Sequence, residues 1–182
     1  MTKTYEVATD RPQVLGVLGG MGPLATADFL AKLIRATPAA RDQDHLPVII
    51  CSFPNIPDRT EAIMSGGPSP LASMRRAMRV LCSCGSARIA IPCNTAHHWF
   101  EELQACSPFK ILHIVDAVLE ELVLRSFTHA NVALLATAAT LRSGVYGKRL
   151  LGAGFRIMLP RRRRTAGIER RNTRCQTRTD RK

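Results

Sequence analysis

Short apolar runs alternate with stretches of helical periodicity along the chain, and this alternation restricts the fold more than any other sequence feature. Four runs have the length and composition of buried strands, at residues 14–18, 47–53, 87–91 and 111–115. Turn signals and apolar residues at helical spacing follow them, as in the stretches 23–34, 71–81 and 95–103. This pattern is typical of a parallel sheet covered by helices. We therefore expect an α/β fold made of three-layer lobes with parallel sheets.

A second unit begins after the fourth apolar run. A helix-like stretch at 117–124, a strand-like run at 132–135, a small-residue turn and a helix around Tyr146 loosely repeat the first unit. No apolar periodicity resumes after Pro160, and the second unit is shorter than the roughly 100 residues of an independent α/β domain. We expect a first lobe over residues 13–112, an incomplete second lobe over residues 113–159, and a basic disordered tail over residues 160–182.

The net charge of +12 is concentrated at the C-terminal end of the chain. Residues 161–182 contain ten Lys or Arg against Glu169 and Asp180, which gives this stretch a net charge of +8 and leaves +4 for the other residues. No aromatic side chain is interleaved there to stack on bases. We therefore expect a solvated tail and no specific nucleic-acid partner.

The apolar runs and the cysteines indicate the compartment. No uncharged apolar run approaches the roughly 20 residues of a membrane helix, so we expect no membrane association. Cys51 ends one strand-like run and Cys93 follows another, which are positions where intracellular proteins keep reduced thiols. No second Cys-x-x-Cys or His pair completes a set of four ligands around Cys93 and His97, so we expect no metal. A cytoplasmic location is the resulting prediction.

The segment from Ile89 to His98 is the sharpest candidate for chemistry. A strand is expected to deliver Cys93 to its carboxyl end, where the next helix begins within two residues, over unpaired N–H groups and the positive end of a helix dipole. This position lowers the pKa of a thiol from about 8.5 toward or below 7. Asn94 and Thr95 can donate to a ligand carboxylate or cap the helix. The alternative, of equal weight, is a buried Cys93 that only fills space.

His97 lies four residues after Cys93, on the same side of the expected helix. It could pair with the thiolate, as in a Cys-His hydrolase, and thereby support Cys93. The more common alternative is a histidine that hydrogen-bonds the backbone or caps an edge of the core.

The turn after the first strand contains Gly20, Gly22 and Ala25 at the spacing of a loose dinucleotide fingerprint. That fingerprint also needs an acid at the end of the second strand, where this chain has Cys51 and Ser52. The turn can equally bind a small anion through its N–H groups. Arg59, which follows the second strand, could hold a carboxylate in a bidentate pair; a surface arginine paired with Asp58 or Glu61 is the alternative.

Five ordered motifs together resemble the aspartate/glutamate racemase family, and within it the aspartate racemases, over about residues 13–155. They are Gly-Val-Leu-Gly-Gly-Met-Gly-Pro at 16–23, Asn-Ile-Pro-Asp-Arg-Thr at 55–60, Ile-Pro-Cys-Asn-Thr-Ala-His at 91–97, Leu-His-Ile-Val-Asp-Ala at 112–117, and Leu-Leu-Ala-Thr-x-x-Thr-Leu at 134–141. The resemblance implies a cofactor-independent racemase of two pseudo-symmetric α/β lobes, with an acidic amino acid between two cysteines, one from each lobe. It implies Cys93 as the first cysteine, Arg59 as a ligand of the substrate carboxylate, and Met21, Asn94, Thr95, Thr137 and Thr140 as substrate-lining residues.

The chain departs from this family toward its C-terminal end. The family's second cysteine lies in a Gly-Cys-Thr-Glu motif, which is absent here, and Cys175 has different neighbours and no strand before it. Ala139 stands where the family usually has glycine. The abrupt change to an Arg- and Thr-rich sequence after Pro160 is what a frameshift would produce.

Three functions follow from these observations. The first is an aspartate-racemase-like protein that interconverts L- and D-aspartate by thiol acid/base chemistry, needs no cofactor and is impaired by loss of the second cysteine. The second is a catalytically inactive relic that binds aspartate or glutamate. The third, a nucleotide-binding oxidoreductase, depends on the weak glycine match alone. For the first two, the expected partner is a small acidic amino acid, with a homodimer as the assembly considered.

Overall fold

The main sheet of the computed structural model, which describes residues 14–127 and 129–159, has four parallel strands. In the order β2-β1-β3-β4 these are β2 (Val48–Ser52), β1 (Val14–Gly19), β3 (Ser86–Ala90) and β4 (Lys110–Leu112). Val17 of β1 lies between Ile50 of β2 and Ala90 of β3 in the parallel register. The expected parallel α/β fold is thereby confirmed. The expected tail over residues 160–182 lies outside the described residues.

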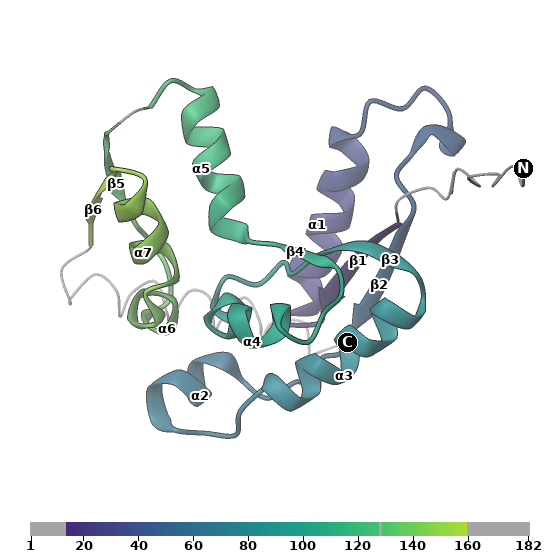
Figure 1. Cartoon of the computed structure of the whole chain (residues 1–182), viewed down its shortest axis with the longest axis horizontal. Helices are drawn as coiled ribbons and strands as arrows, with labels where there is room; N and C mark the ends of the chain where they lie inside the picture. Colours follow the sequence, from purple (N-terminus) through teal and green to yellow (C-terminus); the bar gives the residue numbers. More distant parts are fainter. Residues whose placement is uncertain (1–13, 128, 160–182) are drawn as a thin grey trace, which may run out of the picture.

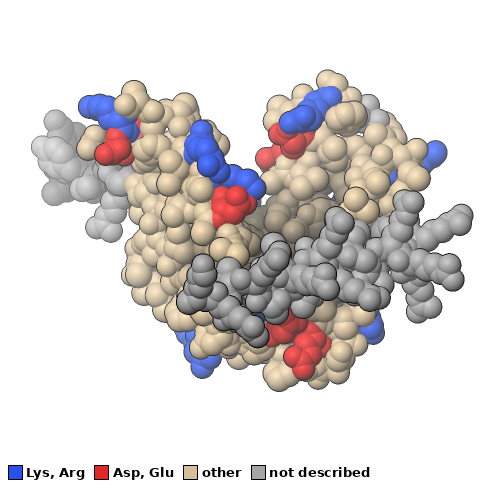
Figure 2. Space-filling view, turned by 180° about the vertical axis from the view of Figure 1, so that it is seen from behind, with Lys and Arg blue, Asp and Glu red and all other residues tan. Residues whose placement is uncertain are grey.

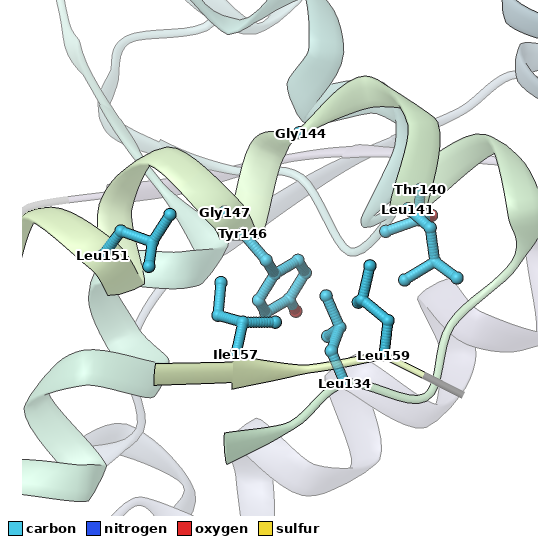
Figure 3. A pocket seen from close by; sticks show the side chains of 9 residues that line it. All are labelled: Leu134, Thr140, Leu141, Gly144, Tyr146, Gly147, Leu151, Ile157 and Leu159. Carbon is cyan, nitrogen blue, oxygen red and sulfur yellow. The ribbon is translucent and has the colours of Figure 1, made fainter. Parts of the chain in front are cut away.

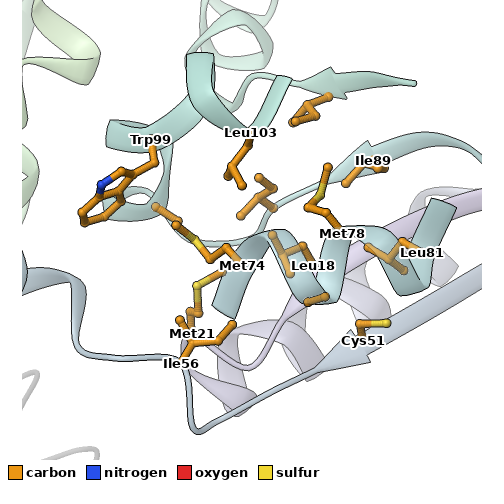
Figure 4. Packing of buried hydrophobic residues seen from close by; sticks show 14 residues of the cluster. Leu18, Met21, Cys51, Ile56, Met74, Met78, Leu81, Ile89, Trp99 and Leu103 are labelled. Atoms are coloured by element: carbon orange, nitrogen blue, oxygen red, sulfur yellow. The ribbon is translucent and has the colours of Figure 1, made fainter. Parts of the chain in front are cut away.

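Successive residues of β1 point to opposite faces of this sheet, and helices cover both faces. Val17 packs with Phe29 and Leu33 of helix α1 (Pro23–Ala36), whereas Leu18 belongs to the larger cluster of the opposite face. Figure 4 shows that cluster, in which Met74 and Met78 of helix α3 (Leu71–Ser83) lie beside Leu18. Both methionines are buried and fill the core.

Two connections of the first lobe contain short helices. A 3-10 helix, η1 (Asp42–Asp44), precedes β2, and helix α2 (Arg59–Ser65) follows β2. After β3 the chain forms a second 3-10 helix, η2 (Thr95–Trp99), which continues directly into α4 (Phe100–Gln104). The helix expected after Cys93 is therefore present, but its first five residues are 3-10 rather than α-helical.

The second lobe contains helices α5 (Ile114–Leu124), α6 (Ala138–Ser143) and α7 (Val145–Gly152) and a parallel pair of strands, β5 (Asn131–Ala133) and β6 (Arg156–Met158). Figure 1 shows α5, α7 and this pair of strands on one side of the molecule and α1 with the four-stranded sheet on the other. The fourth predicted strand, 111–115, is too long: β4 ends at Leu112 and α5 begins at Ile114, because the His113 ring caps the helix. The boundary between the lobes stays an interpretation.

The second lobe has a small core and much exposed apolar surface. Val115, Leu150 and Phe155 form its buried cluster. By contrast, several large apolar side chains around the two strands are more than half exposed: Leu135, Leu151, Met158 and Leu159. Within the described part of the chain, no helix has the length and apolar character needed to cross a membrane.

Figure 2 shows the described surface from behind, hollowed between the two lobes. Basic and acidic side chains are interspersed on this face and lie on both sides of the hollow. This mixed distribution agrees with the sequence, in which most of the net positive charge belongs to residues 161–182.

Candidate functional site

The predicted site residues follow the carboxyl ends of the parallel strands, where α/β proteins bind their ligands. Met21 follows β1, Arg59 follows β2 and Cys93 follows β3, while Thr137 follows β5 of the second lobe. The parallel strand order directs the first three segments to one edge of the main sheet, whereas Thr137 belongs to the separate pair of strands.

Cys93 and Met21 differ in exposure. Met21 is only 6% exposed and belongs to the main core cluster, so it is a core residue. Cys93 is half-buried and packs against the same cluster. The thiol is thus partly accessible and is held by apolar neighbours.

Three threonine hydroxyls connect the two lobes. Thr95, at the start of η2, lies with its Oγ1 2.8 Å from Oγ1 of Thr140 on α6, and both side chains are buried. Oγ1 of Thr140 is in turn 3.0 Å from Oγ1 of Thr137, the N-cap of α6, which accepts the Thr140 N–H. The structure therefore joins three of the predicted residues in one hydrogen-bonded chain, which begins two residues after Cys93.

Asn94 makes a second connection between the lobes. Its side chain does not cap η2; instead, Oδ1 accepts a 2.6 Å hydrogen bond from the hydroxyl of Tyr146 on α7. Sequence reasoning placed Tyr146 on a helix of the second lobe but missed it as a site residue. The two partners are 52 positions apart in the sequence, which left no spacing signal for this contact.

Arg59 is the first residue of α2, and its guanidinium is turned back onto the preceding loop. Nη1 donates to the carbonyl oxygens of Ile56 at 3.2 Å and Pro57 at 3.1 Å. Asp58 caps α2 by accepting the Glu61 N–H at 2.7 Å. No ion pair forms between Arg59 and a carboxylate of residues 14–127 or 129–159. The buried Nε finds no hydrogen-bond partner among these residues either. The surface ion pair considered as an alternative is therefore not formed.

His97 does not pair with the thiol of Cys93 as the functional hypothesis expected. Its Nδ1 lies 2.9 Å from the backbone carbonyl oxygen of Cys93, and its Nε2 accepts the N–H of Ile114 at 3.1 Å. Both ring nitrogens are thus used by the backbone, which is the alternative considered from the sequence. Burial lowers the pKa of His97, so the neutral ring with a proton on Nδ1 satisfies both contacts. His97 ties the Cys93 turn to the first turn of α5.

His113 packs beside His97 and also serves α5. Its Nδ1 accepts the N–H of Val115 at 3.2 Å, and its ring centroid is 4.9 Å from that of His97. Burial, followed by the nearby His97 and Arg149, lowers the pKa of His113 to about 4. His97 and His113 are therefore both neutral at pH 7.

Acidification is expected to destabilise the fold through His113. The unfolded side chain titrates near 6.5 and the folded one near 4, so the unfolded chain binds more protons between these values. The stabilisation is complete above about pH 6.5 and is lost as the pH falls toward 4. Thermal melts at pH 7 and pH 5 should show a drop in Tm that is smaller in His113→Asn, which keeps a capping side chain without titrating. His98→Gln, at an exposed histidine, should keep the full drop; equal drops in all three proteins would contradict this role.

Gly19, the last residue of β1, and Gly20, the first residue after it, pack closely against the rest of the protein. A Cβ at Gly19 would lie 2.6 Å from Oγ1 of Thr26, and one at Gly20 would meet the backbone of Phe53. The Gly20 N–H already donates to Oγ1 of Thr26 at 2.9 Å. Gly20 is therefore closed off by the protein and its N–H is already used, whereas nothing lies within 4 Å of a Cβ at Gly22. A dinucleotide at this turn is disfavoured by the missing acid at the end of β2, where the chain has Cys51 and Ser52.

An apolar pocket of about 260 Å³ lies in the second lobe (Figure 3). Its walls are Leu134, Thr140, Leu141, Gly144, Tyr146, Gly147, Leu151, Ile157 and Leu159. Thr140 and Tyr146 thus contribute both to this pocket and to the contacts between lobes. Among the described residues, no three His, Cys, Asp or Glu side chains gather as a metal site would require.

The fold and the position of these residues define an α/β protein whose site lies where parallel strands end. The profile of the Asp/Glu/hydantoin racemase family matches residues 18–182, and the chain belongs to this family.

Individual relatives agree with this assignment. The broad specificity amino-acid racemase RacX of Bacillus subtilis is 31% identical over 158 residues, which cover 80% of this chain and 63% of RacX. The aspartate racemase of Picrophilus torridus superposes with a TM-score of 0.76 at 34% identity, over 85% of this chain and 65% of that structure. An aspartate racemase homologue from Pyrococcus horikoshii shares the fold, with a TM-score of 0.71 at 24% identity over 87% of this chain and 69% of that one. The chain thus spans slightly less than two thirds of RacX and of the Picrophilus enzyme.

Proposed function

We propose that this chain binds aspartate between its lobes and that Cys93 exchanges a proton with the α-carbon of the bound amino acid. The observation that carries the proposal is the meeting of polar side chains from both lobes at Asn94 and Thr95, the two residues that follow Cys93. Asn94 and Thr95 come from the first lobe, and Thr140 and Tyr146 from the second. The similarity to the Picrophilus aspartate racemase supports an acidic amino acid as the ligand.

The proposed chemistry uses protein groups alone. The Cys93 thiolate removes the α-proton, the electron pair stays on the α-carbon, and the adjacent carboxylate spreads the charge. Inversion then requires an acid on the opposite face, since a single residue that returns its own proton restores the starting enantiomer. Residues 113–159 contain no cysteine, so the second lobe offers no matching thiol there. We therefore propose that Cys93 exchanges the α-proton on one face of the α-carbon and that the chain racemises aspartate little. This function is close to that of the catalytically inactive binding protein considered from the sequence.

Arg59→Ala is expected to weaken aspartate binding tenfold or more while changing Tm only slightly. A lost charge-assisted hydrogen bond costs about 1.5–3 kcal/mol, which corresponds to this change in Kd. Calorimetric titration of the wild type and the variant with L-aspartate measures the effect. Arg35→Ala, which removes an exposed charge from the last turn of α1, is the matched control and should keep the wild-type Kd.

The same titrations separate this proposal from its rivals. Nicotinamide dinucleotide should give no binding signal with the wild type. An unchanged Kd in Arg59→Ala would remove Arg59 from the site, and unfolding of the variant would give it a structural role through its bonds to Ile56 and Pro57.

We also propose a reducing compartment, such as the cytoplasm, for this protein. The five cysteines of the described residues are all free thiols. A free Cys93 is required for the proton exchange proposed above, and oxidation would block it.

A further inference from the structure

The hydrogen bond between Tyr146 and Asn94 determines how the Asn94 amide faces its surroundings. An asparagine amide has an oxygen that only accepts and a nitrogen that only donates. Here Oδ1 accepts the Tyr146 hydroxyl at 2.6 Å, while Nδ2 makes no hydrogen bond to another described residue. The oxygen is therefore turned toward the second lobe, and the two N–H donors stay available on an exposed residue next to Cys93.

Tyr146 is held firmly enough to impose this orientation. Its ring is half-buried and packs against the small core of the second lobe, where it lies among the residues of the apolar pocket (Figure 3). Arg149, on the next turn of α7, pairs with Asp116 of α5 at 2.6 Å, and its guanidinium lies 5.4 Å from the ring centroid of Phe100. Burial raises the pKa of Tyr146, so its hydroxyl keeps the proton that it donates.

We infer that Tyr146 is a positioning residue for substrate recognition, which acts by holding the Asn94 amide with its N–H donors toward a carboxylate of the ligand. The inference rests on the proposed binding of aspartate beside Cys93. Rotating the amide by half a turn would instead present an oxygen, which repels a carboxylate. Tyr146 thereby favours an anionic ligand without touching it.

A double-mutant cycle tests this role, with L-aspartate as the titrant and succinate as a dicarboxylate without an amino group. Tyr146→Phe keeps the ring and removes only the hydroxyl, so Tm should stay close to the wild-type value. Loss of one hydrogen bond of about 1 kcal/mol predicts about a fivefold weaker Kd for both ligands. Asn94→Ala should lose at least as much, and the double variant should bind no more than about twofold more weakly than Asn94→Ala. Lys148→Ala, at an exposed position of the same helix, is the control and should keep the wild-type Kd.

The titrations distinguish failure of the positioning role of Tyr146 from failure of the proposed function. An unchanged Kd in Tyr146→Phe, or losses that simply add in the double variant, would overturn the inference and leave the proposed function intact. Absence of aspartate binding by the wild type would overturn the proposed function and the recognition role together. The side-chain amide resonances of Asn94, labelled with ¹⁵N and assigned through their loss in Asn94→Ala, give an independent readout in the free protein. They should shift in Tyr146→Phe, and unmoved resonances would contradict the orienting contact.

Discussion

Cys93→Ala is expected to abolish exchange of the α-hydrogen of aspartate with deuterated water while leaving aspartate bound. Cys93 is half-buried, follows the carboxyl end of β3, directly precedes the residues that contact the second lobe, and is proposed to act as the base. Loss of a positioned acid or base typically slows a proton transfer about 10²–10⁴-fold. The α-proton signal of aspartate in a proton NMR time course measures the exchange directly.

The enantiomer and a second cysteine provide the controls for this experiment. Because Cys93 approaches one face of the α-carbon, exchange should be confined to one enantiomer and should proceed with retention. Cys106→Ala removes an exposed thiol from the first lobe and should keep the wild-type rate. Exchange that continues at the wild-type rate in Cys93→Ala would show that another group is the base.

Gly20→Ala is expected to destabilise the first lobe by about 2–5 kcal/mol. Gly20 has a φ of 88°, and a Cβ there would lie 2.7 Å from the carbonyl oxygen of Phe53, which is backbone and cannot rotate away. The left-handed conformation and the overlap both add to the cost. Denaturant unfolding of the variant and the wild type gives the difference in the free energy of unfolding.

Gly66→Ala separates the two contributions. Gly66 also has a positive φ, 68°, but no atom of the described residues lies within 4 Å of its Cβ position. This variant should lose only about 1–2 kcal/mol, the cost of the backbone conformation alone. Equal losses at both positions would show that the turn moves away from Phe53.

The first-lobe strands could be predicted because they are short, continuous apolar runs, and helix α3 because its apolar residues follow the period of 3.6. Helix α2 was missed because its seven residues bury no side chain and show no apolar stripe. Its signals were at its ends, where Asp58 and Glu61 have capping-box spacing and Gly66 adopts the left-handed conformation. The end of β4 was misplaced because His113 caps α5 through a ring nitrogen, which the usual N-cap residues do not suggest.

The family motifs identified most residues of the candidate site, but not the contacts between them. Thr95 and Thr140 are 45 residues apart, and their hydrogen bond depends on how α6 packs against η2. The spacing of His97 from Cys93 suggested a thiol partner, whereas the β4–α5 connection places the Ile114 N–H at the same ring. Contacts of this kind are set by tertiary packing, which local spacing does not encode.

Chiral chromatography of L- and D-aspartate after long incubation with the 182-residue chain tests the central claim most directly. The account predicts that each enantiomer keeps its configuration, even where its α-hydrogen has been replaced by deuterium, because Cys93 acts on one face alone. Robust interconversion that is lost in Cys93→Ala would contradict the account and show that a second acid completes the site.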